Sequence, residues 1–328
     1  MNVAQLKSQI FLASPDNFEH IALCLCQWQY ENSKVYRQYV DLISVDIYSI
    51  TQLSQIPFLP IQFFKTHSII SSLPTKEPTI FESSGTTLAI KSKHYIQDLS
   101  LYTESYRACF QRFFGNVTEY CILGLLPSYL ERNNSSLVYM VNDLISASGH
   151  PESGFYLHDF DLLQQTLQKL EAKKQKTILF GVTFGLLDFA ESHAMPLSYV
   201  KIMETGGMKG RREEWTKQEV YTYLQERFST ADIYSEYGMT ELLSQAYSLH
   251  DGIFSTPPWM KILCRDINDP FDIREQGRGA INIIDFANLF SCCFIATDDI
   301  GEIYEDQSFS IHGRIDNSEL RGCSLMLA

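Results

Sequence analysis

Residues 177–207 read TILFGVTFGLLDFAESHAMPLSYVKIMETGG, and this stretch decides the fold class. The run Thr177 to Phe180 predicts a buried strand, Gly185 to His193 predicts a helix, and Tyr199 to Met203 predicts a second strand before the Gly206-Gly207 turn. A strand, a helix and a strand in this succession are typical of a layered α/β domain with crossover connections.

The alternation continues on both sides of this stretch. Apolar residues at three- and four-residue spacing predict a helix over 18–42. Pro57 and Pro60 favour an extended segment over 56–61, because proline is excluded from a regular helix interior. The remaining elements are predicted as strands at 78–81, 120–126 and 233–237, and as helices at 98–114, 162–174 and 213–228.

The pattern changes after about Ser248. Short apolar runs are there separated by Gly, Asp and Asn turns, which predicts a smaller β-rich part near the C-terminus. We therefore predict an α/β fold class with one large domain over 1–312, followed by a hinge stub and tail over 313–328. The large domain is divided into an N-terminal helical segment (about 1–75), an α/β core (about 76–248) and the β-rich part (about 249–312).

Composition excludes several classes of function. The chain has 328 residues, 45% of them hydrophobic, and a formal net charge of −13. That charge argues against a nucleic-acid surface, which needs clustered Lys and Arg. The first ten residues lack the apolar core of a secretory signal, and no apolar run reaches the roughly 18 residues of a membrane span. We predict a cytoplasmic protein with no membrane span and no nucleic-acid partner.

The eight cysteines do not follow a metal-binding or disulfide pattern. None forms a C-x-x-C pair, and most lie in apolar runs, where a free thiol behaves as a small hydrophobe. Cys323 differs, because it lies in the polar stretch Arg321 to Ser324 near the end of the chain. We predict no disulfide framework.

The segment Phe81 to Thr87, FESSGTT, is a candidate phosphate-binding loop. Small residues let backbone N–H groups approach an anion, and the hydroxyl groups add further donors. A Ser-Ser-Gly-Thr sequence is also typical of an ordinary solvent-exposed turn, so the motif by itself favours the turn.

Two later motifs add candidate nucleotide-binding residues. In Tyr234 to Glu241, YSEYGMTE, an aromatic ring can stack on a purine, a Thr hydroxyl can reach a phosphate and a Glu can hold Mg²⁺. In Thr297 to Gly301 and Gly313 to Asp316, an Asp can bind ribose hydroxyls beside an Arg. The alternatives are a helix N-cap at Thr240 and a pair of hairpin turns.

The order of these motifs is more specific than any one of them. Ser-Ser-Gly-Thr-Thr, Gly-Gly, Tyr-Gly-Met-Thr-Glu, Thr-x-Asp and Gly-Arg-x-Asp follow one another over more than 200 residues. This order resembles the adenylate-forming superfamily of acyl-CoA synthetases and related ligases. The chain more closely resembles the acyl-protein synthetases of bacterial bioluminescence, the LuxE family. The segments that carry this resemblance are IPFLPI (56–61), FFK (63–65), SKHY (92–95), FGVTF (180–184), ETGGMKG (204–210) and SELRGCSL (318–325).

The resemblance implies the layered N-terminal domain of adenylate-forming enzymes, with ATP and Mg²⁺ as cofactors. The residues implied to bind ATP are Ser83, Ser84, Gly85, Thr86 and Thr87 at the phosphates, Gly206, Gly207 and Tyr237 at adenine, Gly238 next to Tyr237, and Asp299 at the ribose with Arg314 close by. The implied catalytic residues are Thr240 at the α-phosphate, Glu241 as the Mg²⁺ ligand, His94 near the phosphate loop and Cys323 as acyl acceptor. The segment implied to border the acyl pocket is Phe180, Gly181, Val182, Thr183 and Phe184, a run that is equally typical of plain core.

The sequence departs from the superfamily pattern at two places. Leu88 stands where the loop usually has a second glycine, and the nearest lysines are Lys91 and Lys93. Acyl-CoA synthetases also carry a C-terminal domain of about a hundred residues, an ordinary small-domain size, which supplies a catalytic lysine. We expect this mobile domain to be absent or vestigial here and assign no residue to that lysine role.

The resemblance implies ATP-dependent activation of a carboxylic acid, expected to be a fatty acid, to an acyl-adenylate. Transfer to the Cys323 thiol would follow, and then transfer to a protein acceptor such as a reductase, a carrier protein or an acyltransferase. Two other functions remain open: a CoA or carrier-protein ligase of the phenylacetate-CoA ligase type, and a non-catalytic, degenerate nucleotide-binding subunit.

Overall fold

Strand β6 (Thr177–Val182) lies inside the parallel part of a large sheet and is buried along its whole length. It pairs in parallel with β4 (Cys121–Leu125) on one side and β7 (Val200–Thr205) on the other. Strands covered on both faces have near-continuous apolar sequences, as the run Thr177 to Phe180 does. Helix α8 (Thr183–Ser192) follows β6 at once, so the predicted strand, helix and strand are confirmed.

The computed structural model describes residues 2–71, 77–84, 90–127, 132, 134–206 and 215–315. The other α-helices of this part are α1 (Val3–Gln9), α2 (Phe18–Asn32), α3 (Lys34–Leu42), α4 (Phe63–Thr66), α5 (Leu99–Phe114), α6 (Ser136–Ser148), α7 (Phe160–Ala172) and α9 (Lys217–Phe228). The other strands are β1 (Leu59–Pro60), β2 (Thr79–Glu82), β3 (Lys93–Ile96), β5 (Gly154–Phe155), β8 (Ile233–Tyr237), β9 (Ala246–Ser248), β10 (Phe254–Ser255), β11 (Met260–Arg265), β12 (Ile273–Arg274), β13 (Gly277–Asp285), β14 (Phe294–Ile303) and β15 (Phe309–Arg314).

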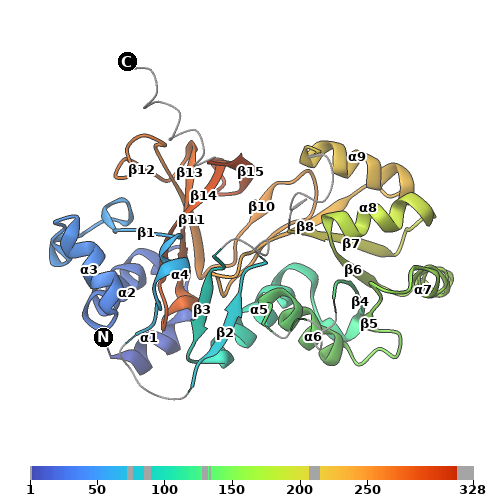
Figure 1. Ribbon diagram of the computed structural model, residues 1–328, viewed down its shortest axis with the longest axis horizontal. Helices are drawn as coiled ribbons and strands as arrows, with labels where there is room; N and C mark the ends of the chain where they lie inside the picture. Colours follow the sequence, from blue (N-terminus) through green and yellow to red (C-terminus); the bar gives the residue numbers. More distant parts are fainter. Residues whose placement is uncertain are drawn as a thin grey trace.

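Most strands belong to one sheet with two different halves (Figure 1). Strands β5, β4, β6, β7 and β8 pair in parallel, in that order. From β9 onward, through β10, β15, β14, β13, β11 and β12, neighbouring strands are antiparallel. The predicted β-rich C-terminal part is therefore present, and it continues the same sheet. Strands β2 and β3 form a separate antiparallel pair.

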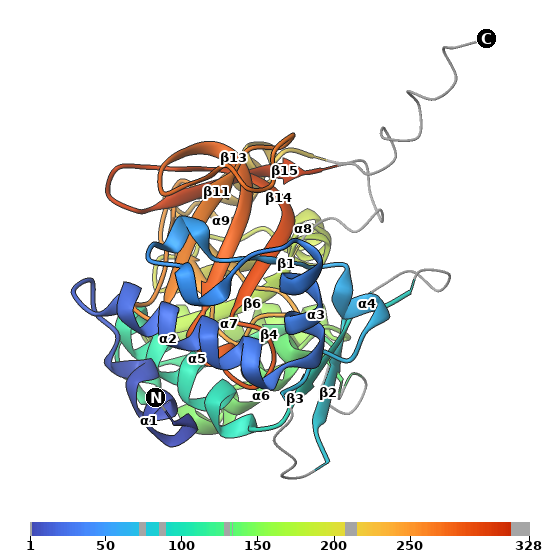
Figure 2. The same cartoon turned by 90° about the vertical axis from the view of Figure 1, so that its left-hand side faces the viewer.

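Two apolar cores cover the two faces of the parallel strands. One face, with Leu179 and Ile202, packs against α7, α8 and α9. The other face, with Phe180 and Met203, joins a larger core that includes α5, α6, the N-terminal helices and the β-rich strands. Figure 2 shows α2 and α3 from the side on which they cover the β-rich strands, where the rings of Tyr36 and Phe294 stack. Alternating side chains thus make β6 to β8 a middle layer.

The structure corrects some predicted elements. The single helix predicted over 18–42 is two helices, because Ser33 is extended (φ −106°, ψ 112°) and its side chain caps α3 by accepting from Tyr36 N. Helix α6, which the sequence analysis does not predict, begins after the N-cap Ser135 and ends at Gly149 in the left-handed region (φ 62°). The extended segment around Pro60 includes β1, which pairs in parallel with β14.

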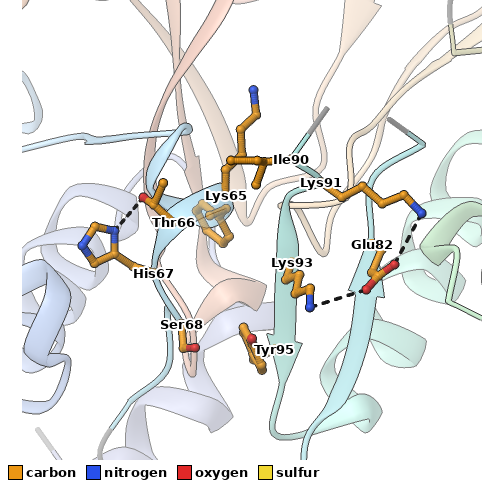
Figure 3. Close-up of a pocket in the computed structure, with 10 residues that line it drawn as sticks. Lys65, Thr66, His67, Ser68, Glu82, Ile90, Lys91, Lys93 and Tyr95 are labelled. Atoms are coloured by element: carbon orange, nitrogen blue, oxygen red, sulfur yellow. Dashed lines mark hydrogen bonds and ion pairs between the residues drawn. The ribbon is translucent and has the colours of Figure 1, made fainter. Parts of the chain in front are cut away.

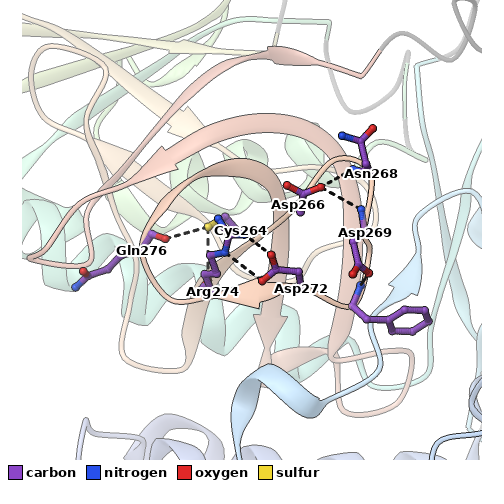
Figure 4. Close-up of polar contacts among 8 residues, drawn as sticks. Cys264, Asp266, Asn268, Asp269, Asp272, Arg274 and Gln276 are labelled. Atoms are coloured by element: carbon purple, nitrogen blue, oxygen red, sulfur yellow. Dashed lines mark hydrogen bonds and ion pairs between the residues drawn. The ribbon is translucent and has the colours of Figure 1, made fainter.

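The loop between β11 and β12 is shaped by its own polar groups (Figure 4). Asp266 Oδ1 accepts hydrogen bonds from the backbone N–H groups of Asn268 (2.8 Å) and Asp269 (3.1 Å). Asp272 forms an ion pair with Arg274, and Cys264 Sγ lies 3.3 Å from Gln276 O. Such local side-chain to backbone bonds are typical of Asp in turns. These bonds lie beside the core, because Cys264 belongs to it and Ile273 packs against it.

None of the described helices combines the length and the hydrophobicity that a membrane crossing requires.

Candidate active site

A cavity of about 140 Å³ lies at the carboxyl ends of β6, β7 and β8. Four residues predicted to bind nucleotide line it: Ser84 after β2, Gly206 after β7, and Gly238 and Thr240 after β8. Ligands of open α/β sheets bind outside the carboxyl ends of the strands. The fold therefore brings these four residues, which are far apart in the sequence, to one cavity.

One face of the three strand ends forms a wall of this cavity. Val182, Thr205 and Glu236 are neighbours in register on β6, β7 and β8, and all three line the cavity. The Thr205 hydroxyl donates a hydrogen bond to Glu236 Oε2. Burial raises the pKa of the Glu236 carboxyl to about 7; the Thr205 hydrogen bond opposes the rise, and the nearby Glu204 adds to it.

The opposite face of β8 carries the residues predicted for adenine and ribose. Because side chains alternate along a strand, Tyr237 points away from the wall that holds Glu236. The Tyr237 hydroxyl donates to Asp299 Oδ2 (2.7 Å), and Arg314 Nε lies 3.0 Å from Asp299 Oδ1. The Tyr237 ring packs edge-on against Phe309, with centroids 5.5 Å apart. Strands β8, β14 and β15 thus bring Tyr237, Asp299 and Arg314 together.

Arg314 and Tyr237 stabilise the ionised form of the Asp299 carboxyl. Burial raises the pKa of the Asp299 carboxyl, while the Arg314 guanidinium and the Tyr237 hydroxyl oppose the rise. The pKa of the Tyr237 phenol is raised mainly by burial and then by the Asp299 charge, so the phenol stays a donor at neutral pH. A second cation lies close by, because Lys217 Nζ at the start of α9 sits 4.5 Å from the Phe254 ring centroid. Its burial lowers the pKa of the Lys217 ammonium, and nearby carboxylates oppose this effect.

The predicted phosphate-binding loop begins at Ser83, where β2 ends. Ser83 N donates to Ser92 O (3.0 Å), and Ser92 N donates to Ser83 Oγ (3.0 Å). These reciprocal bonds tie the start of the loop to the strand that follows it. Ser84, the next residue, lines the cavity.

His94 holds the backbone of the motif that contains Thr240. Its Nδ1 lies 2.8 Å from Thr240 O, and because a carbonyl only accepts, this nitrogen carries the proton. The side chain is completely buried, and its Nε2 has no hydrogen-bond partner among the described residues. Burial lowers the pKa of His94 to about 4, so the ring is neutral at pH 7. In the structure His94 therefore orients the Thr240 loop.

Asp285, which the sequence analysis did not select, anchors the other end of this loop. Its carboxylate accepts from the backbone N–H of Leu243 (2.8 Å) and of Ser244 (3.0 Å), and from the Ser244 hydroxyl (2.6 Å). Asn288 Nδ2 donates to Glu241 O (2.8 Å). The loop from Thr240 to Ser244 is therefore held by strand β13 and the turn after it.

Glu241, the predicted Mg²⁺ ligand, is almost fully buried. Burial raises the pKa of its carboxyl, and a hydrogen bond from the Ser92 hydroxyl opposes the rise most strongly. Arg314 and Lys65 lower it further. The carboxyl lies beside the base of the predicted phosphate-binding loop, because Ser92 also pairs with Ser83.

The profile of the family described as acyl-protein synthetase, LuxE, matches residues 18–328. The chain belongs to this family. No curated protein sequence matches the chain significantly. The structure is similar to ATP-bound MatB from Rhodopseudomonas palustris, with a TM-score of 0.54 and 18% sequence identity over 72% of this chain and 47% of that one. It is also similar to apo MatB from the same organism, with a TM-score of 0.53 and 17% identity over 73% of this chain and 48% of that one.

The LuxE-family chain therefore spans about half the length of these two structures. At such identities the likeness shows the fold alone, which is similar to that of the N-terminal domain of adenylate-forming enzymes. The predicted family and fold class are confirmed.

The predicted acyl-pocket segment of this LuxE-family member has different surroundings at each residue. Val182 lines the cavity, whereas Phe180 is completely buried in the larger core. A Cβ at Gly181 would lie 2.6 Å from Leu186, so this glycine lets α8 approach the strand. Thr183 donates a hydrogen bond to Glu204. Of this segment, only Val182 is a lining residue of the cavity; the role predicted for the segment stays a prediction.

Some predicted residues lie outside the described part of this LuxE-family chain. They are Gly85, Thr86, Thr87 and Gly207 in the two glycine motifs, and Cys323 in the tail. Leu88 also lies outside the described residues. Their assignments stay predictions.

A second cavity, of about 460 Å³, lies beside the phosphate-loop segment (Figure 3). Lys65, Lys91 and Lys93 line it, and Figure 3 shows the latter two directed at Glu82. Their ammonium groups lie 3.7 and 3.8 Å from the Glu82 carboxylate. Glu82 also lines the first cavity, so the two cavities of this LuxE-family protein share a wall.

The sequence analysis did not assign a role to Glu236, Gln245 or Lys217. Glu236 occurs within the quoted Tyr234 to Glu241 motif, and strand alternation from Tyr237 could have placed it on the opposite face. Gln245 and Lys217 carry no local signal, because only the folded sheet and helix α9 bring them to the site.

Proposed function

We propose that this protein activates a carboxylic acid with ATP and transfers the acyl group to a thiol. The acid carboxylate attacks the α-phosphorus of ATP, which forms acyl-AMP and releases pyrophosphate. A thiolate then attacks the acyl carbon, which forms a thioester and releases AMP. Family membership supports this chemistry, and the resemblance implies a fatty acid as substrate.

One observation carries the proposal. Ser84, Gly206, Gly238 and Thr240, which come from three separate segments, line one cavity at the carboxyl edge of the parallel strands. Backbone groups and hydroxyls there would hold a bound substrate in position before it reacts. The entropy of orienting the substrate would then be lost on binding and would not add to the barrier of the reaction. The position of this cavity is where α/β sheets bind their ligands.

The proposed ATP site extends to the other face of β8. Tyr237 would stack on adenine, and Asp299 with Arg314 would bind the ribose. Ser83, Ser84, Gly85, Thr86 and Thr87 would contact the phosphates, with Gly206, Gly207 and Gly238 beside the adenine. The similar MatB structure was solved with ATP bound, which supports ATP as a ligand of this chain.

The residues present fit a magnesium ion accompanying ATP. Mg²⁺ in nucleotide sites is held by one or two carboxylates together with phosphate oxygens. Glu241 supplies a single buried carboxylate next to Ser92 and one residue after Thr240. Bound magnesium would neutralise phosphate charge, while Thr240 would orient the α-phosphate and His94 would keep the Thr240 backbone in place.

We propose Cys323 as the residue that accepts the acyl group. Six described cysteines are poor nucleophiles, because burial raises the pKa of each thiol: Cys26, Cys109, Cys121, Cys264, Cys292 and Cys293. The described Cys24 is partly exposed and provides a natural control. A protein acceptor, such as a reductase, a carrier protein or an acyltransferase, would then take the acyl group from the thioester.

A labelling experiment tests both steps. The full chain is incubated with Mg·ATP and radiolabelled acids of several lengths, and pyrophosphate exchange is measured in parallel. A denaturing gel then compares wild type, Cys323→Ala and the matched control Cys24→Ala, with and without hydroxylamine. We expect an ATP-dependent, hydroxylamine-labile label that is lost only in Cys323→Ala.

The other possible results distinguish a different nucleophile from the two alternative functions. Exchange with a label that persists in Cys323→Ala would move the nucleophile to another residue. Exchange with no protein label, and acyl transfer to added CoA or carrier protein, would favour a CoA or carrier-protein ligase. ATP binding without exchange for any acid would favour a non-catalytic nucleotide-binding subunit.

A further inference from the structure

The second cavity, of about 460 Å³, has an excess of positive charge. The lysines that line it are Lys65 from α4, Lys91 from the segment before β3, and Lys93 from β3 itself. Glu82 is the carboxylate of this lining, and His67 would add a further positive charge when protonated. In a chain whose formal net charge is −13, the three lysines against one carboxylate make this cavity a local site for an anion.

The three lysines are accessible to a ligand. Lys65 is exposed and makes no ion pair with another described side chain. The ammonium groups of Lys91 and Lys93 lie 3.7 and 3.8 Å from the Glu82 carboxylate, and their side chains are 40% and 50% exposed. These distances exceed the range of about 2.7 to 3.2 Å for an N–H···O hydrogen bond. The flexible lysine stems can therefore turn the ammonium groups toward an incoming anion.

The second cavity adjoins both ends of the predicted phosphate loop. Ser84, the last described residue before residues 85–89, lines the first cavity, whereas Ile90 and Lys91, directly after them, line the second. Glu82 lines both cavities. Thr240, which is proposed to orient the α-phosphate, lines the first cavity. A triphosphate whose α-phosphate lies in the first cavity would therefore extend past Glu82 toward the lysines of the second.

Lys65 also connects the second cavity to the proposed magnesium ligand. Burial raises the pKa of the Glu241 carboxyl, and the charge of Lys65 is among the effects that oppose this rise. The ammonium group must lie near the carboxyl to have this effect. Magnesium in nucleotide sites is held by carboxylates together with phosphate oxygens. Phosphates that share a magnesium ion with Glu241 would therefore lie close to Lys65.

We propose that the second cavity binds the β- and γ-phosphates of ATP, and that Lys65, Lys91 and Lys93 stabilise the pyrophosphate that leaves. This inference rests on the proposed function and adds three residues to its phosphate site. When a carboxylate oxygen of the acid bonds to the α-phosphorus, the bond from that phosphorus to the oxygen that bridges to the β-phosphate breaks. Its electron pair stays on pyrophosphate. Ammonium groups that face this developing charge lower the barrier of the reaction.

Calorimetry of the full chain with Mg²⁺ and without acid tests the proposal by binding alone. ATP, AMP, pyrophosphate and CoA are titrated into wild type, Lys65→Gln, and a double variant with Lys91→Gln and Lys93→Gln. We expect the ratio of the AMP to the ATP dissociation constant to fall about tenfold in each variant, because charge-assisted contacts to the phosphates are lost. Pyrophosphate affinity should fall by a similar factor, and AMP affinity should change less than about twofold.

Two further variants separate a binding role from an effect on folding. Glu82→Gln removes the carboxylate that competes with an anion for two of the lysines, so pyrophosphate should bind several-fold more tightly. The new amide oxygen can still accept the hydrogen bond that Asn134 Nδ2 donates to Glu82. The matched charge control combines Lys34→Gln and Lys173→Gln, two exposed lysines that do not line the cavity. It should change each dissociation constant less than about twofold.

The possible failures are distinguishable. ATP affinity that the lysine variants leave unchanged, or ATP and AMP affinities that fall by the same factor, would overturn this inference and leave the adenylation proposal standing. A loss confined to CoA would also overturn it, because the cavity would then bind the phosphates of an acyl acceptor. No ATP binding to wild type and no pyrophosphate exchange with any acid would overturn the proposed function, and this inference with it. Circular dichroism shows whether a lost affinity reflects lost folding, and misfolding cannot produce the tighter binding expected for Glu82→Gln.

Discussion

Replacing Glu236 with Gln should stabilise the protein in a way that depends on pH. Burial raises the pKa of this carboxyl from its ordinary 4.5 to about 7, so folding favours the protonated form. A raised carboxyl pKa gives no penalty below about pH 4.5, a growing penalty between pH 4.5 and 7, and a constant one above. A pKa difference of one corresponds to about 1.4 kcal/mol, so the full penalty is about 3 kcal/mol.

Glutamine is neutral at every pH and escapes this penalty. The free energy of unfolding of Glu236→Gln minus that of wild type should therefore rise by about 2 kcal/mol between pH 5.5 and pH 8. Urea unfolding followed by circular dichroism at several pH values measures the difference, and groups that titrate equally in both proteins cancel. The exposed Glu305→Gln serves as control and should give a flat difference. A flat or falling difference for Glu236→Gln would refute the claim that this carboxyl is buried with a raised pKa.

Three further predictions concern the residues that hold the site. Asp285→Ala should lower the free energy of unfolding by at least about 3 kcal/mol, because several buried donors lose a charged acceptor; a loss below about 1 kcal/mol in urea unfolding would contradict this. Gly238→Ala should lower kcat/KM for the acid at least about tenfold, but far less in a Glu236→Ala background, where the side chain 2.3 Å from the new Cβ is absent; equal losses in both backgrounds would show that the clash is not the cause. Asp299→Asn should weaken ATP binding about 10- to 100-fold by calorimetry, as loss of charged hydrogen bonds predicts, whereas the adjacent Asp298→Asn should not; similar losses in both would remove Asp299 from the ribose site.

The α/β class could be predicted because its signals are local. Apolar runs such as Thr177 to Phe180, bounded by turn residues, indicate buried strands wherever they occur. Elements with weaker local signals were missed. Ser33 breaks the predicted N-terminal helix, and α6 was not predicted although Ser135 and Gly149 cap it.

The candidate site was predicted in part for the same reason. The motifs around Ser83, Tyr237 and Asp299 are short continuous segments, so their order along the chain indicated a family that the profile match confirms. Asp285 was missed, because the bonds that it makes join β13 to a loop about forty residues earlier in the sequence. His94 was predicted near the phosphate loop, but its contact with the Thr240 carbonyl depends on folding.

The sequence by itself therefore determined the fold class, the family and the order of the nucleotide motifs, because hydrophobic periodicity and motif spacing are properties of neighbouring residues. Only the tertiary structure decided which side of β8 each residue faces and which partners it meets there. Glu236 and Tyr237 are adjacent in the chain, yet the first joins Thr205 at the cavity wall and the second joins Asp299 on the other face. That separation arises from the alternation of side chains along a strand whose register is set by its neighbours in the sheet.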